Sequence, residues 1–397
     1  GKSAKKRVRW EDSAGAVGGA ETVEEVPRKA EKTKKSIGAG PRVEDRGDDN
    51  EGAAASGSDG DGCAEEEVEV SGGEAGRTTS KGKPGKAKMR TVSIALPGEI
   101  VQNAQSHMLR TQLAGLVARA VAIFKVQEIV IFSETGSIRF DDDGPKQGKK
   151  GRTDPSVFLA RLLQYIECPQ YLRKHCFPVH DDLKLAGLLP PLDAPHHLRR
   201  YEHSRYRDGV VVSARHADGG TEETTSSNLA YIGLDGAVTI DRKLRPGIRV
   251  TLDLGKEGAQ GRVGRGTVVS RSTPVASGDT YWGYNVRIAD SLDEVLSECP
   301  YGQYDLVVGT SDRGTVLGEN NIREPRTFSH LLIVFGGVPG LEECHRKNGE
   351  KYGDGVKSLF DMYLNTCPGQ GTRTIRTEEA MQITLAVLRP HLSKGII

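Results

Sequence analysis

The chain lacks the features that mark several large classes of protein. No apolar run approaches the roughly 18–20 residues of a membrane-spanning helix, and the first residues are basic and polar, unlike a secretory signal. The formal net charge is only +1 over 397 residues, so a surface for nucleic acid would have to come from local clusters of cations. These absences predict an intracellular protein without a membrane partner.

Cysteine is sparse as well. The six cysteines form no C-x-x-C pair, which argues against a structural zinc site, and a chain of this length needs no disulfide framework. We therefore expect free thiols, a reducing compartment and no bound metal. Cys367 has the chemistry of a nucleophile, but no histidine is near it in the sequence, and packing beneath a turn is the alternative.

The common nucleotide-binding motifs are also missing. The sequence contains no G-x-x-x-x-G-K-[ST], and no G-x-G-x-x-G separates the first predicted strand from the first predicted helix. An ordinary P-loop is thereby excluded and an ordinary dinucleotide site is disfavoured. A nucleotide-binding regulator is the weakest of the functional hypotheses, because the phosphate-binding lysine is absent.

Residues 1–88 are rich in Gly, Ala, Ser, Glu and Lys, and their only aromatic residue is Trp10. Such a segment cannot bury enough apolar surface to offset its ordering entropy, so we predict a disordered, charged tail. Its alternating basic and acidic clusters suit either nuclear import and RNA contact or a solvated linker without a dedicated role.

Regular patterns begin at residue 91. Val92, Ile94 and Leu96 alternate as in a strand, apolar residues at helical spacing follow over 109–124, and residues 128–132 form a second apolar run. The order strand, helix, strand predicts a parallel α/β unit. Further along, Asp154-Pro155 has the residue types that cap and start a helix.

The texture changes between residues 204 and 290. Short β-branched runs separated by turn residues, the last of them at 284–288, predict a small all-β barrel. Arginines and a cluster of aromatic residues on such a barrel suit single-stranded nucleic acid, because bases stack on rings while cations follow phosphates. For Trp282, a place in the barrel core is the alternative. The predicted RNA-binding residues are Arg205, Arg207, Arg249, Trp282 and Arg287.

The α/β pattern returns from residue 291 to the end. Three predicted buried strands are each followed by a glycine-bearing loop, at residues 309–314, 335–340 and 365–375, and Thr377 is the expected N-cap of a final helix. A parallel sheet needs strands from both sides of the β-module, so the module is an insertion. Loops at the carboxyl ends of parallel strands are where an open α/β sheet binds a ligand.

These loops carry a resemblance. Residues 334–337 with 340–342, and the run 365–380, resemble the SPOUT methyltransferase superfamily, and more closely its archaeal and eukaryotic branch of RNA methyltransferases with an OB-fold-like insertion. The resemblance extends from residue 91 to the C-terminus and includes residues 92–98, 165–174 and 187–197.

The resemblance implies a deep trefoil knot near the C-terminus, an exception to the rule against threaded chains. It further implies S-adenosylmethionine bound within the knot loops, and a homodimer whose active site uses both subunits. Arg313 is the implied catalytic residue, near the methionine part of the cofactor or the target base, although sequence alone favours a surface cation there. The implied cofactor contacts are Thr310, Phe335, Gly336, Gly337, Asn365, Thr366, Cys367, Pro368, Gly371, Thr372 and Ile375.

The expected activity is therefore methylation of structured RNA, in particular ribosomal RNA, at a base atom such as uridine N3, in the nucleus or nucleolus. A catalytically silent RNA-binding scaffold with the same fold is the rival hypothesis. The expected organisation is a tail (1–88), the first part of a SPOUT domain (89–203), an OB-like barrel (204–290) and the second part of the SPOUT domain with the knot (291–397).

Overall fold

The computed structural model describes residues 90–139, 153–213, 226–261, 263–278, 280–317, 327–347 and 355–394. The predicted tail lies outside this set. So does a basic stretch of the sequence at residues 146–152, which contains Lys146, Lys149, Lys150 and Arg152. The strands are β1 (Thr91–Pro97), β2 (Glu128–Phe132), β3 (Tyr206–Val212), β4 (Ser227–Tyr231), β5 (Val238–Leu244), β6 (Arg249–Asp253), β7 (Arg265–Val269), β8 (Asn285–Ala289), β9 (Leu306–Val316), β10 (His330–Val334) and β11 (Met362–Asn365). The α-helices are α1 (His107–Ile123), α2 (Pro155–Glu167), α3 (Arg173–Cys176), α4 (Gly255–Ala259), α5 (Thr273–Gly278), α6 (Leu292–Ser297), α7 (Leu341–Lys347) and α8 (Thr377–Lys394). Turns of 3-10 helix are η1 (Gly98–Asn103), η2 (Gln170–Leu172), η3 (Asp181–Leu183), η4 (Ala186–Leu188) and η5 (Val356–Leu359).

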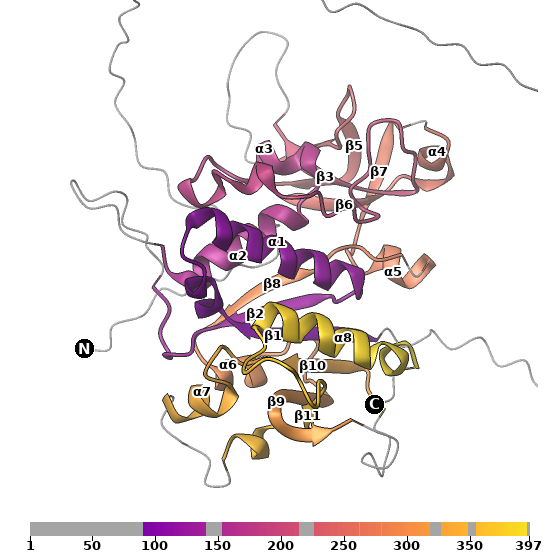
Figure 1. The fold of residues 1–397 in the computed structure, drawn as a ribbon. Helices are drawn as coiled ribbons and strands as arrows, with labels where there is room; N and C mark the ends of the chain where they lie inside the picture. The colour runs from indigo at the N-terminus through magenta and orange to yellow at the C-terminus, as the bar shows by residue number, and fades with distance from the viewer. Residues whose placement is uncertain are drawn as a thin grey trace, which may run out of the picture. The chain divides into compact units, whose positions relative to one another are not determined.

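Six strands form a parallel sheet in the order β11-β9-β10-β1-β2-β8, which confirms the predicted α/β class. Helices α1, α2 and α8 pack on one face of this sheet, and α6 and α7 pack on the other (Figure 1). Since both faces are covered, every residue of β1 is buried, which explains its nearly continuous apolar sequence. The carboxyl ends of all six strands meet at one edge.

The start of α2 follows its sequence signals. The Asp154 carboxylate accepts a hydrogen bond from the Ser156 N–H at 2.9 Å, and Pro155 occupies the first turn, where its missing N–H costs nothing. The apolar side chains of α2, among them Leu159, Leu162 and Leu163, are fully buried against the sheet. The predicted helix is confirmed.

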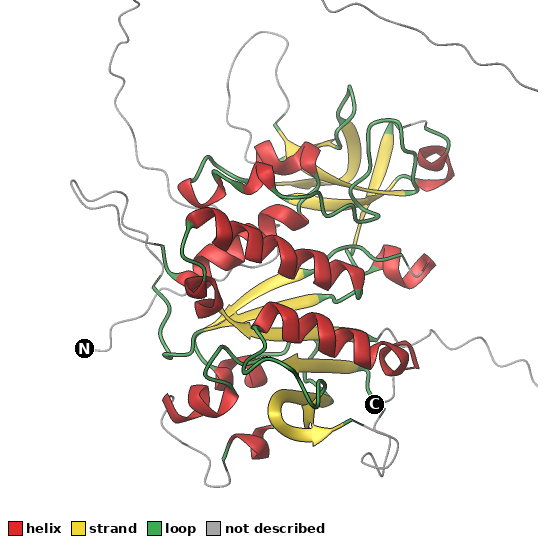
Figure 2. Cartoon of the chain, in the orientation of Figure 1, coloured by secondary structure: helices red, strands yellow, loops and turns green. Residues whose placement is uncertain are grey.

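A separate group of strands closes into a barrel in the order β3-β4-β5-β7-β6 (Figure 2). The assignment of residues 284–288 to this barrel is wrong, because they form β8 of the parallel sheet, where Val286 pairs with Ile129 of β2. The preceding aromatic residues lie inside the molecule as well. The Tyr281 hydroxyl donates to the Val126 carbonyl at 2.8 Å, and the Tyr284 hydroxyl to Leu163 at 2.9 Å. With β8 the chain therefore returns from the barrel to the parallel sheet.

Two of the three predicted loops follow strands, whereas residues 309–314 belong to β9 itself. β11 pairs with β9 on both sides of a register jump, with Tyr363 opposite Gly309 and Leu364 opposite Thr315. Residues 310–314 therefore bulge out of a continuous strand. The apolar run at residues 359–364 is the third predicted strand, and the strand that forms there starts later than the run does. A 3-10 turn ends at Leu359, and β11 begins only at Met362.

The cap of α8 also differs from the prediction by one residue. The Arg376 N–H donates to Glu379 Oε2 at 2.9 Å, while the Glu379 N–H donates to the Arg376 carbonyl at 3.0 Å, so Arg376 precedes the helix. Thr377 is the first helical residue, and its hydroxyl donates to the Gly336 carbonyl at 2.8 Å. This bond ties the final helix to the turn after β10.

Candidate functional site

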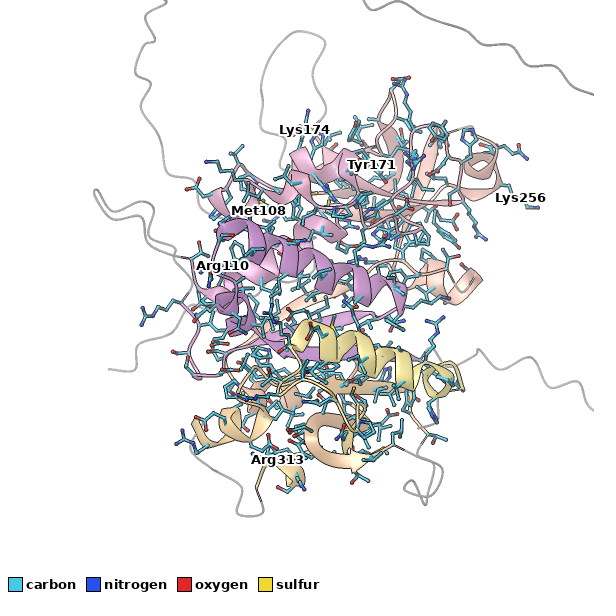
Figure 3. All side chains as sticks on the ribbon, viewed as in Figure 1. Met108, Arg110, Tyr171, Lys174, Lys256 and Arg313 are labelled. Carbon is cyan, nitrogen blue, oxygen red and sulfur yellow. The ribbon has the colours of Figure 1, made fainter. Side chains whose placement is uncertain are left out.

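A cavity of about 280 Å³ opens at the carboxyl ends of β9, β10 and β11, under the first turns of α8. Its walls come from the bulge of β9, the turn after β10 and the segment after β11, the three regions in which the sequence predicted ligand contacts. Figure 3 marks Arg313 on the β9 side. The lining residues are Thr310, Ser311, Asp312, Arg313, Phe335, Gly336, Gly337, Val338, Pro339, Gly340, Glu342, Leu364, Asn365, Thr366, Cys367, Gln370, Arg373, Thr374, Ile375, Thr377, Ala380, Ile383 and Thr384.

The β9 bulge is held by its own polar side chains. The Thr310 hydroxyl donates to the Val334 carbonyl at 3.0 Å, and the Ser311 hydroxyl donates to Glu342 Oε1 at 3.0 Å. The Ser311 hydroxyl also accepts from the Arg313 N–H at 3.2 Å. These bonds fix the backbone at Arg313, while its side chain lies on the exposed part of the bulge.

The turn after β10 needs glycine for reasons of packing. A Cβ on Gly336 would lie 2.7 Å from the Leu341 backbone nitrogen, closer than real Cβ atoms approach. Gly340 has a φ of +86°, a conformation that other residues rarely adopt. Phe335 is buried beside the turn, with 1% of its surface exposed. Close packing therefore fixes the backbone of this turn, whose residues line the cavity.

The segment after β11 is joined to the β9 bulge by one side chain. The Asn365 amide donates to the Asp312 carbonyl at 2.9 Å, and its oxygen accepts from the Cys367 N–H at 3.0 Å. The Thr366 and Thr384 hydroxyls are 2.7 Å apart, which joins the same segment to α8. No histidine is among the described residues that line the cavity, so Cys367 has no histidine partner there.

The structure brings most of the predicted cofactor residues together. Those that line the cavity are Thr310, Phe335, Gly336, Gly337, Asn365, Thr366, Cys367 and Ile375, together with Arg313. Pro368, Gly371 and Thr372 do not line it, although their neighbours Gln370, Arg373 and Thr374 do. The roles of all these residues remain predictions.

Sequence reasoning missed the α8 side of the cavity and its carboxylates. Ala380, Ile383 and Thr384 follow Thr377 at helical spacing, so the predicted helix carried a usable signal. Asp312 and Glu342 had no such signal, because their meeting depends on the bulge. Apolar side chains and carboxylates thus line one cavity, a combination that fits a ligand with a flat apolar ring and a cationic group.

The barrel residues predicted to face RNA are mostly interior. Arg249 is 9% exposed, and its guanidinium bonds Glu167 Oε2 at 2.6 Å and Asp208 Oδ2 at 2.5 Å. Trp282 is 4% exposed and donates its indole N–H to Asp208 Oδ1 at 2.9 Å, so it is interior, as the alternative expected, but it is not part of the apolar core of the barrel. The positions of these two residues do not support contact with RNA, since their donors are saturated by buried carboxylates.

The three remaining arginines of that set differ among themselves. Arg207 is 3% exposed and donates to the carbonyls of Ile232 at 2.8 Å and Glu202 at 3.1 Å. Arg287 belongs to β8 and donates to Glu128 Oε1 at 3.2 Å, so it lies in the sheet. Arg205 alone of the five has a largely exposed side chain, although it pairs with Asp253.

A buried ionic cluster joins α2 to the barrel. Glu167 at the end of α2 pairs with Arg249 and Arg271, and the His196 ring lies 2.9 Å from Glu167 Oε1. Burial alone would raise the pKa of Glu167, but the two guanidiniums hold that pKa well below its usual range. The pKa of Asp208 is lowered in the same way, chiefly by Arg249. Both carboxylates are therefore charged and neutralised within the cluster.

In the part of the chain that the structure describes, no group of three or more His, Cys, Asp or Glu residues is arranged to hold a metal ion. None of the helices in this part combines the length and the apolar character needed to cross a membrane.

The chain is similar to proteins of known name over most of its length. A family described as "Putative RNA methyltransferase" matches residues 91–388. A Drosophila melanogaster protein named 28S rRNA (uridine-N(3))-methyltransferase is 43% identical over 343 residues, which are 84% of this chain and 68% of that protein. Proteins of the same name from Mus musculus (46% identity, 77% of each chain) and Homo sapiens (45% identity, 78% of this chain and 81% of the other) are also similar. The matched region contains the sheet, the cavity and the barrel.

Proposed function

The chain belongs to the RNA methyltransferase family that matches residues 91–388, and from this premise we propose that it transfers a methyl group from S-adenosylmethionine to a base of structured RNA. The observation that carries the proposal is the cavity in which the three predicted regions meet. The names of the three relatives support ribosomal RNA as the substrate and uridine N3 as the acceptor. Such a substrate fits a nuclear or nucleolar location.

The cavity has the chemistry that this cofactor requires. Its volume of about 280 Å³ is close to the lower end of the range for small-molecule sites, about 300–1,000 Å³. Leu364, Ile375 and Ile383 supply an apolar surface for the adenine ring, and the carboxylates of Asp312 and Glu342 suit a cationic group. When bound, S-adenosylmethionine supplies an electrophilic methyl group. Backbone groups around Gly336 and Thr366 complete the proposed binding site.

The protein's part in the reaction is positioning and the handling of one proton. Holding two reactants in line is worth up to ~7–11 kcal/mol in well-oriented systems. Uridine N3 carries a proton that must leave, and Asp312 and Glu342 are the carboxylates of the cavity that can accept it. The guanidinium of Arg313, exposed on the β9 bulge, would stabilise the negative charge that develops on the base.

Arg313→Ala tests this assignment. We expect methyl transfer to transcribed ribosomal RNA fragments to fall by about 10²–10³-fold, the usual cost of one lost electrostatic contact in the transition state. Cofactor affinity, measured by titration calorimetry, should be retained. Arg200→Ala is the matched control, because Arg200 is an exposed arginine paired with Asp235 outside the cavity.

Three results would argue against the proposal. Intact transfer by Arg313→Ala would remove the assigned catalytic residue, and a folded protein that does not bind S-adenosylmethionine would remove the activity. Cofactor binding without methylation of any cellular RNA would favour the silent RNA-binding scaffold. The family match does not favour this rival, because an active enzyme and a scaffold would share it.

We also propose a homodimer. Leu109, Leu116 and Ile123 are 47%, 46% and 56% exposed and recur every seven residues along α1, so they form an apolar stripe on one helix face. Met108, labelled in Figure 3, lies at the start of the same helix. A second copy would cover the stripe across a two-fold axis. Leu116→Lys should yield monomers in sedimentation experiments, whereas Val179→Lys, at an exposed site away from α1, should not.

The proposed trefoil knot and OB-like character rest on topology. After β10 the chain crosses β9 and adds β11 at the edge of the sheet, and the segment after β11 leads back to Thr377, which is bonded to Gly336 just after β10. This order supports a chain end threaded through the loops that hold the cofactor. The closed order of β3 to β7 supports an OB-like barrel. A crystal structure with an unthreaded C-terminus would refute the knot.

A further inference from the structure

A second cavity, of about 730 Å³, lies between the barrel and the amino ends of the sheet strands. The sheet contributes Arg90 and Gln127, which precede β1 and β2, and Asn285, the first residue of β8. The barrel contributes residues of β5, β6 and β7. Because the sheet is parallel, this groove is at the opposite edge from the cavity beneath α8. We call it the amino-end groove.

The charge of the amino-end groove is of one sign. Four arginines, Arg90, Arg242, Arg249 and Arg271, are among its described lining residues, and no carboxylate is. Arg249 and Arg271 are both paired with the buried Glu167, and Arg249 also with Asp208, so Arg90 and Arg242 carry the positive charge available at the groove. Arg242 has 54% of its side chain exposed, and its partner Asp241 is not part of the lining. The groove therefore presents cations at its rim and is suited to phosphate groups.

The rest of the lining suits a nucleobase. Ile248, Val250 and Val268 give the groove an apolar floor. The Tyr301 ring lines it too and stacks on His330, with ring centres 4.8 Å apart and planes inclined by 2°. Asn285 adds an amide group, whose oxygen accepts from Arg271 at 2.8 Å. Rings, an apolar floor and arginines together are the features by which proteins hold unpaired nucleotides.

We propose that the amino-end groove binds an unpaired segment of the substrate RNA. This inference rests on the proposed function. Arg90 and Arg242 contact its phosphates, and Tyr301 and the apolar floor contact a base. Arg249 and Trp282, which the sequence assigned to RNA, instead form part of the groove wall that the buried cluster holds in place. An acidic peptide could pair with the same arginines, but its carboxylates would not contact the Tyr301 ring or the apolar floor.

The test is the affinity of the full-length protein for a fluorescein-labelled single-stranded RNA of about ten nucleotides, measured by anisotropy over a range of salt concentrations. We expect Arg242→Glu and Arg90→Glu each to weaken binding by about tenfold or more at low salt. Each should also reduce the slope of log K against log salt by about 0.7, the amount expected for one lost phosphate contact. Arg200→Glu reverses an exposed, aspartate-paired charge outside the groove and should change neither quantity.

Cofactor binding separates failure of this proposal from failure of the proposed function. If both groove variants bind S-adenosylmethionine and RNA as the unaltered protein does, the groove proposal is overturned while the methyltransferase assignment stands. If groove variants lose affinity for an acidic peptide and not for RNA, the proposal is also overturned. If the unaltered protein transfers no methyl group but Arg242→Glu still weakens RNA binding, the groove stands and the proposed catalysis fails.

Discussion

The carboxyl-end cavity and the cluster between α2 and the barrel use their polar side chains in opposite ways. In the cavity, Ser311 and Asn365 bond to neighbouring backbone and side chains around a space that stays open. In the cluster, Glu167, Asp208 and Arg249 saturate one another and have almost no exposed surface. An arginine next to a barrel is therefore evidence for a ligand surface only when no buried carboxylate neutralises it.

The largest expected effect comes from breaking the buried cluster. Arg249→Met would leave Asp208 and part of the charge of Glu167 unpaired inside the molecule, and losing one partner of a buried ion pair costs about 3–5 kcal/mol. The free energy of unfolding in urea should fall by that amount. Arg205→Met is the control, because Arg205 pairs with Asp253 in solvent and its loss should leave unfolding unchanged. Equal losses of unfolding free energy for the two substitutions would contradict the distinction between the buried cluster and the exposed ion pair.

A smaller effect is expected at the cavity. Gly336→Ala would force a Cβ against the backbone of Leu341, and such overpacking costs about 1–3 kcal/mol. Cofactor affinity should fall with it, because the turn after β10 would move. Gly371→Ala has open space around the added atom and should change stability by less than about 0.5 kcal/mol. Urea unfolding and calorimetry of both variants would check this, and a destabilising Gly371→Ala would show that the loop is packed more tightly than described.

The smallest effect is a dependence on pH at the edge of the buried cluster. Burial, with the adjacent His196, lowers the pKa of His197 from 6.5 to about 3, and its Nε2 lies 2.7 Å from the Glu167 carbonyl. Between these values the unfolded chain binds a proton that the folded chain does not. Stability therefore falls by about 1.4 kcal/mol per unit as pH drops below 6.5.

His197→Gln removes this titration but keeps an N–H donor for the Glu167 carbonyl. Urea unfolding between about pH 6.5 and pH 5 should show a shallower dependence for the variant. The lowered pKa of Glu167 does not interfere in this window. Its contribution is fully present above its ordinary value of 4.5 and is lost only as pH falls further, toward its folded pKa. Parallel curves for the two proteins would contradict the neutral state of His197 in the folded chain.

Local patterns predicted what depends on neighbours in sequence. The alternation of β1, the Asp154-Pro155 start of α2 and the beginning of α8 near Thr377 were all predictable, because the same few residues that form each signal also form the element. The three regions of the cavity were predictable as well, because the carboxyl ends of parallel strands are where an open α/β sheet binds a ligand. Resemblance to a family added the expectation that these segments meet.

Long-range pairing was not predictable. The run at β8 is equally suited to a barrel or a sheet, and only its pairing with β2 decides between them. Arg249 belongs to the β-module by position, yet Glu167, which neutralises it, is 82 residues earlier. The bulge at residues 310–314 depends on β11 pairing with β9 at two registers. Each of these three features depends on a contact with residues far away in the sequence, which a local sequence pattern does not include.

The register jump between β9 and β11 gives the cavity two kinds of wall. Residues 310–314 are anchored at both ends by strand pairing, so they cannot swing aside without breaking the edge of the sheet. Residues 366–376 have no ladder of their own and are tethered chiefly through Asn365 and the threonine pair at Thr366 and Thr384. A ligand would accordingly enter past the second wall, and its arrival should slow amide exchange there far more than along β9.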